Sequence, residues 1–404
     1  MQTFLSAAYL QTGQGREADR ILRSCVHCGF CTAACPTFLL TGNELDSPRG
    51  RIYLVKTLLE GGTVSTITQS HLDRCLSCQS CETTCPSGVD YHRLLDIGRL
   101  HAEQKMARPL TVRLQRFIMR KVFTSRWLFR VSLSLGRLFR PVLPDGLKQM
   151  IPAKRPAGVW PKQVRERRMV LLGGCVQRSL SPATNAAAAR VLDRFGIQAV
   201  SLKGEGCCGA VSYHLNAQDE GMAQARHNID LLCEQLDQGA EAIVSTASGC
   251  GNFAKEYAKL FSDDKHYAEK AGRVVARMKD ISEVLLAEDL TAFKPDKTAK
   301  LAFHCPCSLQ HGHKLGGVVE TILEKLGFVL TQVGDAHLCC GSAGTYSILQ
   351  PQLAQQLQAN KIAALEAGSP DAIATANIGC QSYLGQVSSR PVKHWIEYLD
   401  DVLG

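Results

Sequence analysis

The sequence has no segment suited to crossing a membrane as a helix, which takes about 20 consecutive, mainly apolar residues. Its long uncharged stretch after Asp335 is interrupted by Gln, Ser, Pro and Asn. The N-terminus has no basic region followed by an apolar run, so we expect no secretory signal and a chain that remains in the cytoplasm. We assign no flavin-binding or nicotinamide-binding fingerprint, such as GxGxxG, to any segment of this sequence. We therefore expect no catalytic residues for substrate chemistry in this chain alone.

Cysteine, by contrast, is abundant, with 18 residues in a chain of 404. In a reducing compartment, clustered cysteines are more often metal ligands or redox groups than disulfides. The hydrophobic fraction of 45% and the charged fraction of 21% are those of a folded globular protein. The length indicates two or three domains.

The cysteines divide the chain into regions. Eight of them lie in residues 1–104, none lies in residues 105–167, and ten lie in the remainder. We expect a first domain at 1–104, a basic helical segment with a Pro-rich linker at 105–167, and two further domains at 168–295 and 296–404.

The net charge of +9 comes from one segment of the chain. Residues 105–154 hold twelve Lys or Arg and a single acidic residue, Asp145, so the rest of the chain carries −2. Over residues 108–140, Arg is mixed with apolar residues such as Trp127, a pattern typical of peripheral contact with an anionic membrane. Packing of the apolar face on a partner subunit or on the chain's own domains explains the pattern equally well. No helicase or nuclease motif accompanies it, so we expect no nucleic-acid partner.

The first region contains the same cysteine pattern twice, as Cys25-x2-Cys28-x2-Cys31-x3-Cys35-Pro36 and Cys75-x2-Cys78-x2-Cys81-x3-Cys85-Pro86. An iron–sulfur cubane needs four thiolates that converge from different directions. In two-cluster ferredoxins the fourth Cys of each run ligates the other cluster. The patterns therefore predict two [4Fe–4S] clusters, one held by Cys25, Cys28, Cys31 and Cys85, the other by Cys75, Cys78, Cys81 and Cys35.

Zinc is the alternative, but zinc sites usually combine two Cys-x2–4-Cys pairs rather than complete four-cysteine runs that end in Cys-Pro. The insert between the runs contains Asp46-Ser-Pro-Arg-Gly-Arg51. Its cations are candidates for hydrogen bonds that tune a cluster. A loop with a capped helix start at Ser47-Pro48 is an equally good interpretation.

The last region contains an internal repeat. Cys175 and Cys305 are 130 residues apart, the two Cys-Cys-Gly motifs at Cys207 and Cys339 are 132 apart, and Cys250 and Cys380 are 130 apart. Each copy alternates apolar strands with helical stretches, which predicts an α/β fold with parallel sheets. Each of these cysteine positions follows a predicted strand. Because the carboxyl ends of parallel strands share one edge, each copy could gather its thiols there.

The Cys-Cys-Gly pattern resembles the cysteine-rich CCG domain of heterodisulfide reductase subunits and related respiratory iron–sulfur subunits. That resemblance implies a further iron–sulfur cluster or another metal in each copy. The family pattern often closes with Cys-x2-Cys, but Ala247 and Asn377 stand where the first of these cysteines is expected. Cys307 is a spare thiol, Cys233 is predicted to lie in the core, and degenerate modules kept as a docking scaffold are the alternative. The candidate ligands are Cys175, Cys207, Cys208 and Cys250 in the first copy, and Cys305, Cys339, Cys340 and Cys380 in the second.

Taken together, the motifs resemble the family of iron–sulfur subunits of bacterial glycolate oxidase (glycolate dehydrogenase) over nearly the full length. The stretches that carry this resemblance are RSCVHCGFCTAACPTF, DSPRGRIYL, LDRCLSCQSCETTCPSGVDYH, CCGAVSYHLNAQ, TASGCGNFAKEY, AFHCPCSLQH, LCCGSAGTYS and TANIGCQ.

The resemblance implies a complex with flavin-containing subunits that oxidise glycolate, in which this chain passes electrons towards a quinone or another acceptor. A location on the cytoplasmic face of the inner membrane fits this role. The alternative is a thiol–disulfide redox subunit like those of heterodisulfide reductase, against which the missing Cys-x2-Cys closure argues.

Overall fold

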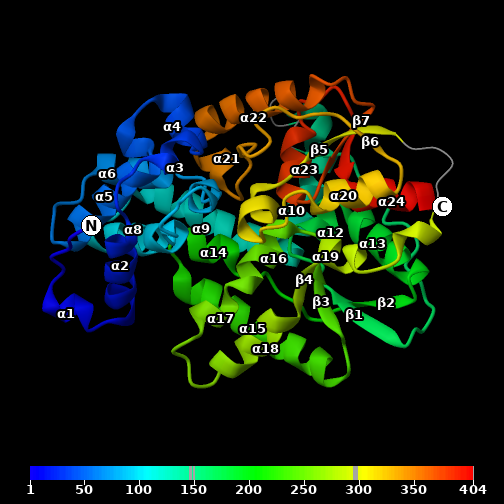
Figure 1. The fold of residues 1–404 in the computed structure, drawn as a ribbon, viewed down its shortest axis with the longest axis horizontal. Coiled ribbons are helices and arrows are strands. Elements are labelled where there is room, and N and C mark those ends of the chain that lie inside the picture. The colour runs from blue at the N-terminus through cyan, green and yellow to red at the C-terminus, as the bar shows by residue number, and fades with distance from the viewer. Residues whose placement is uncertain (145–147, 149–150, 294–298, 404) are drawn as a thin grey trace. The chain divides into compact units, whose positions relative to one another are not determined.

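The computed structural model describes residues 1–144, 148, 151–293 and 299–403, and its chain forms two compact units (Figure 1). The first unit consists of Met1–Phe117 and His337–Lys361, and the second of Ile118–Ala336 and Ile362–Gly404. The domain boundary expected between residues 295 and 296 lies outside the described residues.

The first unit is helical. Its core lies between α5 (Pro48–Leu59) and α8 (Tyr91–Lys105), which bury Ile52, Val55 and Leu94 against each other and against α2 (Gly13–Ser24). Ser47 caps α5, because its hydroxyl accepts a hydrogen bond from the Gly50 amide at 3.0 Å and Pro48 follows it. The other helices are α1 (Ala7–Leu10), α3 (Phe30–Ala33), α4 (Pro36–Thr41), η1 (Glu44–Asp46), α6 (Thr66–Asp73), α7 (Ser80–Thr83) and α21 (Tyr346–Leu349).

The second unit contains two parallel four-stranded sheets with the orders β2-β1-β3-β4 and β6-β5-β7-β8. Their strands are β1 (Arg167–Leu171), β2 (Ile197–Ser201), β3 (Ala242–Ser245), β4 (Met278–Asp280), β5 (Lys300–His304), β6 (Val329–Leu330), β7 (Ala372–Thr375) and β8 (Val392–His394). In both sheets the strand order and the parallel pairing are the same, so the duplicated sequence has a duplicated fold. The predicted α/β fold with parallel sheets is confirmed.

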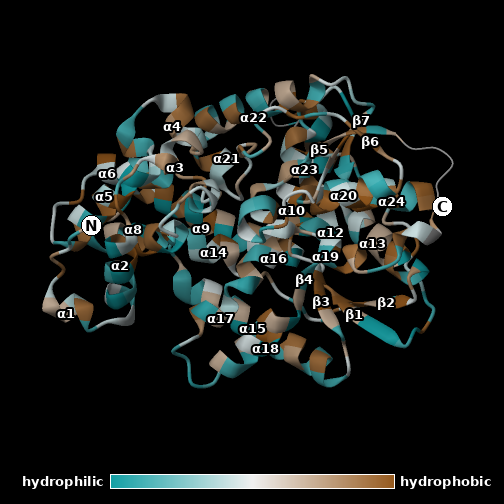
Figure 2. Ribbon diagram, viewed as in Figure 1, coloured by the Kyte–Doolittle hydropathy of each residue, from teal (hydrophilic) through white to brown (hydrophobic). Residues whose placement is uncertain are grey.

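Helices cover these sheets and explain why the central strands are apolar on both faces (Figure 2). α13 (Pro182–Arg194) packs against α24 (Trp395–Leu403), which buries Trp395 completely. One hydrophobic core includes residues of both sheets. The remaining helices of this unit are α12 (Gln177–Leu180), α14 (Ala210–His214), α15 (Gln218–Asp237), α16 (Ser248–Lys255), α17 (Tyr257–Leu260), α18 (Ala268–Arg277), α19 (Ile281–Leu286), η3 (Leu290–Ala292), η4 (Ser308–Gly312), α20 (Val318–Lys325) and α23 (Ile378–Leu384).

The lengths of some strands do not follow from the apolar pattern of the sequence. The run FVLTQV at residues 328–333 has the composition of a strand, but only the two residues of β6 pair with β5. The short strands β4 and β8 were not expected, because three residues are too few to show an alternating pattern.

The basic segment is helical, as predicted, and forms α9 (Leu110–Thr124), α10 (Arg126–Phe139) and η2 (Arg140–Val142). α9 and α22 (Pro351–Glu366) include residues of both units. Of the helices that the structure describes, none is long and apolar enough to cross a membrane.

The contact between α5 and α8 gives a test of the first unit. A Cβ added at Gly98 of α8 would lie 2.4 Å from Val55 Cγ2, whereas a Cβ added at Gly272 of α18 would meet no atom within 4 Å. We expect Gly98→Ala to destabilise the protein by about 1–3 kcal/mol through overpacking against a rigid Val side chain. The matched change Gly272→Ala should stabilise it by about 1 kcal/mol, because Ala is the better helix former.

Anaerobic denaturant unfolding of the full chain, followed by circular dichroism, compares the two variants. Equal shifts of the unfolding midpoint for both would contradict the packing described for α5 and α8.

Candidate functional site

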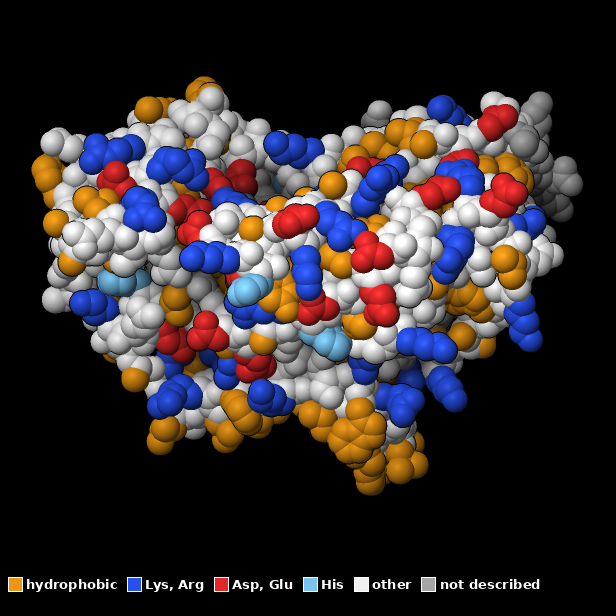
Figure 3. Space-filling model, turned by 90° about the horizontal axis from the view of Figure 1, so that it is seen from below, with side chains coloured by type: hydrophobic (Ala, Val, Ile, Leu, Met, Phe, Trp, Pro, Cys, Tyr) orange, Lys and Arg blue, Asp and Glu red, His pale blue; other side chains and the backbone are white. Residues whose placement is uncertain are grey.

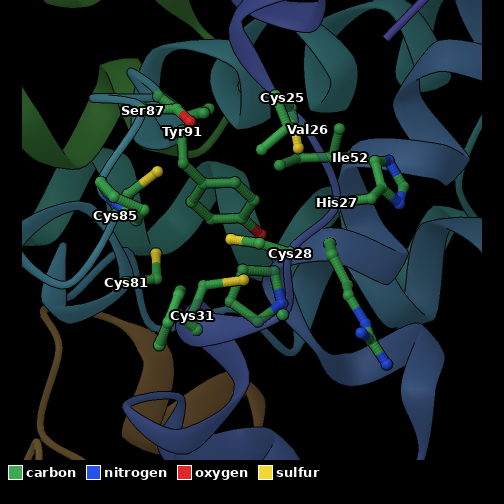
Figure 4. A pocket seen from close by; sticks show the side chains of 16 residues that line it. Cys25, Val26, His27, Cys28, Cys31, Ile52, Cys81, Cys85, Ser87 and Tyr91 are labelled. Carbon is green, nitrogen blue, oxygen red and sulfur yellow. The ribbon is translucent and has the colours of Figure 1, made fainter.

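The first predicted cysteine set, together with Cys81 of the second set, lines a pocket in the first unit (Figure 4). Cys25 directly follows α2, Cys28 lies in the next loop and Cys31 lies in α3, whereas Cys85 comes from the second cysteine run. Burial raises the pKa of the Cys25 thiol, and the neighbouring Cys85 and Cys28 thiols raise it further. Burial likewise raises the pKa of Cys31 to about 11. The structure thus places Cys85, which is the last cysteine of the second run, beside the cysteines of the first run.

The second set is arranged in the same crossed way. Cys75 and Cys78 lie between α6 and α7, Cys81 lies in α7, and Cys35 precedes α4. Burial raises the pKa of the Cys81 thiol well above its ordinary value, and the thiols of Cys78, Cys75 and Cys35 act on it in the same direction. Cys35 therefore lies near the cysteines of the other run.

Both runs use the same unusual backbone. His27 and Gly29 in the first run have positive φ angles of 55° and 87°, and Ser77 and Gln79 at the matching positions have 51° and 62°. Left-handed conformations of this kind cost roughly 1–3 kcal/mol for residues other than glycine. Here they turn amides towards sulfur: the Ser77 amide donates to Cys75 Sγ at 3.4 Å, and the His27 backbone donates to Cys25. Hydrogen bonds of this kind stabilise a negatively charged sulfur ligand.

The donor groups fit iron–sulfur clusters. Each set offers four cysteine sulfurs, the ligands that [4Fe–4S] clusters take. In addition, the hydroxyls of Ser80 and Tyr91 are buried and have no hydrogen-bond partner among the described residues. A buried polar group left without a partner costs about 1–3 kcal/mol. Two such groups beside the cysteine sets indicate that a bound group with acceptor atoms belongs there.

A buried ion network lies beside Cys35. Asp46 is completely buried and accepts hydrogen bonds from Arg51 at 3.4 Å and from Arg74 at 3.1 Å, and His71 Nδ1 lies 2.8 Å from it. Its backbone oxygen accepts a hydrogen bond from the Thr37 hydroxyl at 3.0 Å, and that hydroxyl lies 3.3 Å from Cys35 Sγ. The network connects the insert to a predicted cluster ligand.

Arg51 is the central cation of this network and is completely buried. Its Nε donates to the His71 carbonyl at 2.7 Å and its Nη1 donates to the Thr37 hydroxyl at 3.1 Å. Burial lowers the pKa of Arg51, but Tyr91, Cys75, Cys35 and Asp46 together raise it more, so the net shift is upward. A permanent positive charge therefore lies beside the second cysteine set.

In the second unit, the four candidate cysteines of the first repeat copy lie together. Cys175 follows β1, Cys207 and Cys208 follow β2, and Cys250 lies in α16 after β3. Side-chain hydrogen bonds from Cys175 and Cys208 lower the pKa of Cys207 well below its ordinary value. Cys208 is in turn hydrogen-bonded to Cys250, and its own pKa is raised. The shared edge of the parallel strands thus gathers four thiols, a set that fits a metal or a cluster.

Gly209 allows this arrangement. Its φ angle is +100°, and a Cβ at this position would lie 2.4 Å from the Gly221 carbonyl oxygen. Only glycine fits a position that is both left-handed and in close contact with another backbone segment.

Gly204, Gly206 and Gly209 also have the GxGxxG spacing of dinucleotide-binding loops, which the sequence analysis overlooked. The structure argues against such a site here. The helix that follows, α14, has only five residues, and the Gly206 amide donates to the Asn228 side chain at 2.8 Å rather than facing a free position. The loop presents thiols, not a phosphate site.

Glu205 fixes the loops that carry these thiols. Its buried carboxylate accepts hydrogen bonds from the Gly173 amide at 2.9 Å and the Gly174 amide at 3.0 Å. Arg178 and Arg126 bind the same carboxylate at 2.9 Å and 3.0 Å. The loop before Cys175 and the loop before Cys207 are therefore held by one side chain.

The candidate cysteines of the second repeat copy are divided between the units. Cys305, after β5, and Cys380, in α23, belong to the second unit, where Asn377 Nδ2 donates to Cys380 Sγ at 3.6 Å. Cys339 and Cys340 belong to the first unit. There the Tyr346 hydroxyl donates to the Arg74 carbonyl at 3.1 Å, and burial, Cys75 and Cys339 all raise its pKa.

Cys233 is buried in the hydrophobic core of the second unit, as predicted, and Cys307 is half-buried after β5. The sequence analysis missed Thr37, Tyr91 and Glu205. Tyr91 lies in a quoted stretch, CPSGVDYH, but nothing in its spacing indicates that it lies among the cysteines.

Comparison with known proteins agrees with this architecture. A 4Fe–4S dicluster domain model matches residues 21–89, and a cysteine-rich domain model matches residues 169–254 and 301–385. The chain is 53% identical to the glycolate oxidase iron–sulfur subunit of Escherichia coli, over 100% of this chain and 99% of that protein. It is 31% identical to a probable glycolate oxidase iron–sulfur subunit of Bacillus subtilis, over 89% of this chain and 87% of that protein. Lactate utilization protein A of Bacillus licheniformis is 27% identical over 52% of this chain and 87% of its own length.

The ion network around Asp46 gives a test of the site. Asp46→Asn leaves the buried Arg51 without its counter-charge, which should cost about 3–5 kcal/mol of stability and lower the retained iron. Glu44→Gln is the matched control, because the Glu44–Arg49 pair in the same insert is exposed and should contribute below about 1 kcal/mol. Anaerobic denaturation and iron analysis of both purified variants make the comparison. Equal stability and equal iron in the two would show that the buried network does not support the site.

Proposed function

Because the chain belongs to the family of glycolate oxidase iron–sulfur subunits, we propose that it carries electrons from a flavin-containing subunit towards a quinone or another acceptor. Its dicluster domain and its full-length relatives support the role of an iron–sulfur electron-transfer subunit in an oxidoreductase complex. The observation that supports the proposal most is that Cys85 lies near Cys25 and Cys35 lies near Cys81 within one compact unit.

The ligand assignment follows from this pairing. Cys25, Cys28, Cys31 and Cys85 hold one [4Fe–4S] cluster, and Cys75, Cys78, Cys81 and Cys35 hold the other. The neighbourhood of Cys25 with Cys85 and of Cys81 with Cys35 supports it. When bound, the clusters supply one-electron transfer. The protein's part is to keep the two sets close together, to bury Cys25, Cys35 and Cys81, and to place amides and the Arg51 cation beside the sulfurs.

The oxidation of the 2-hydroxy acid belongs to the flavoprotein subunits in this proposal. A flavin accepts a hydride, which is two electrons at once, and an iron–sulfur chain then removes them singly. This chain contributes no catalytic residue to the substrate step.

The first repeat copy is proposed to hold a further cluster or metal. Cys207, which has a strongly lowered thiol pKa, also has the character of a redox-active thiol, as the alternative of a heterodisulfide-reductase-like subunit requires. However, Cys207 is only 2% exposed, so a disulfide substrate has no open approach to it. Cys207, whose thiolate accepts hydrogen bonds from two neighbouring cysteines, is better suited to be a metal ligand.

A contact with the cytoplasmic face of the inner membrane is the remaining part of the proposal. Several of the basic residues stabilise the fold, since Arg126 binds Glu205 and Arg120 binds Glu220. Hydrophobic side chains nevertheless stay exposed among Lys and Arg on the surface (Figure 3). On α10 and η2 the exposed apolar and basic side chains include Trp127, Arg130, Leu135, Leu138, Phe139, Arg140 and Val142. This mixture of apolar and basic groups suits an anionic lipid surface.

Iron and acid-labile sulfide analysis of the full chain, purified anaerobically, tests the electron-transfer role. We expect about eight iron atoms for the two [4Fe–4S] clusters, besides any held by the repeats. Cys28→Ser and Cys78→Ser should each remove a different cubane signal from the electron paramagnetic resonance (EPR) spectrum. Cys233→Ser, in the core, should remove neither. Zinc in place of iron, or one signal lost in both variants, would overturn the assignment.

Sedimentation with lipid vesicles tests the membrane contact. The full chain should bind vesicles of phosphatidylglycerol and phosphatidylcholine more tightly than vesicles of phosphatidylcholine alone. Replacing Leu138 and Phe139 by Ser should reduce binding at least tenfold, because both side chains are more than half exposed and available to enter the lipid. Replacing the exposed Val329 by Ser is the matched control. Unchanged binding of the Leu138/Phe139 variant would assign this surface to a partner subunit.

A further inference from the structure

Tyr91 occupies a position shared by the two cysteine sets. It is the first residue of α8 and lies two residues after the buried Val89, so its backbone is fixed by the core of the first unit. Its side chain is only 4% exposed. Its ring lines the pocket of Cys25, Cys28 and Cys85, and Figure 4 shows it in the midst of these thiols.

The pocket that the ring lines also includes Cys81, a cysteine of the other set. The groups that act on the Tyr91 hydroxyl are the thiols of Cys75, Cys81 and Cys35 and the guanidinium of Arg51. Burial raises the Tyr91 pKa well above its ordinary value, and Cys75 raises it further. The phenol is therefore neutral and is a hydrogen-bond donor at any physiological pH.

This donor lacks an acceptor in the protein. The Tyr91 hydroxyl is buried and has no hydrogen-bond partner among the residues that the structure describes. Arg51, its charged neighbour, cannot accept, because a guanidinium has donors only, and these are bound by His71, Thr37 and Asp46. The other groups that act on the hydroxyl are the thiols of Cys75, Cys81 and Cys35, which are predicted cluster ligands.

We propose that the Tyr91 hydroxyl donates a hydrogen bond to a sulfur of the cluster held by Cys75, Cys78, Cys81 and Cys35, while its ring packs against the other cluster site. Tyr91 is thus a positioning residue that distinguishes the two clusters. The inference rests on the ligand assignment under Proposed function.

The physical consequence is a difference in reduction potential. One-electron reduction adds negative charge to the cluster and its sulfur ligands. A hydrogen bond donated to sulfur stabilises this charge and raises the potential, as the nearby Arg51 cation also does. The second cluster is therefore the better electron acceptor of the two, so electrons settle on it after entering the first unit.

An EPR redox titration of the full-length chain with Tyr91→Phe tests this proposal. The variant removes one oxygen atom and keeps the ring. We expect the signal that is lost in Cys78→Ser to shift to a more negative potential, with a roughly tenfold lower ratio of reduced to oxidised cluster, or about 59 mV. The signal that is lost in Cys28→Ser should move much less. Tyr398→Phe is the control, since Tyr398 is a buried tyrosine whose hydroxyl already binds the Ile373 and Pro391 carbonyls.

A second variant covers the case in which Tyr91→Phe loses iron. Difluorotyrosine placed at position 91 keeps the shape of the side chain and makes the hydroxyl a stronger donor, so the same signal should shift to a more positive potential. Two cubanes with unchanged potentials in either variant would overturn the role of Tyr91 and leave the proposed function intact. A wild-type chain without cubanes would overturn the proposed function itself.

Discussion

The proposed crossing of the two cysteine runs is the constraint on which the first unit depends. Cys85 must reach the side of Cys25 and Cys35 must reach the side of Cys81, although fifty residues separate the matching positions of the two runs. The insert between the runs therefore has to fold back, and α5 does so by packing on α8. The left-handed residues at 27, 29, 77 and 79 are part of the same constraint, because they turn the chain tightly around each set.

Charge is distributed to suit this arrangement. A bound [4Fe–4S] cluster with four thiolates carries net negative charge. Beside the cysteines the structure places a fully buried arginine, two left-handed loops with inward amides, and two hydroxyls that have no partner among the described residues. Burying Arg51 would be costly if Asp46 did not compensate it. The Asp46 carboxylate also pairs with Arg74 and His71. One carboxylate therefore connects the insert, the end of α6 and the start of the second cysteine run.

The sequence predicted the features that cysteine spacing encodes and missed those that depend on long-range packing. The repeat offset predicted two copies of a parallel α/β fold, and the thiols of the first copy do meet at one sheet edge. Spacing could not show that Cys339 and Cys340 belong to the first unit, because that follows from how residues 337–361 pack. Likewise, Tyr91 and Glu205 have ordinary local surroundings in the sequence. They acquire a role only when distant loops bring thiols and amides to them.

The most direct measurement of the central claim is the EPR spectrum of the fully reduced, full-length chain, recorded beside its iron and acid-labile sulfide content. In the proposed assignment, crossed ligand sets hold two clusters within a single small helical unit. The account therefore predicts two reduced cubanes whose signals are broadened and split by magnetic interaction with each other. Two independent, unsplit signals would contradict the crossed arrangement. A protein with no acid-labile sulfide would contradict the iron–sulfur assignment altogether.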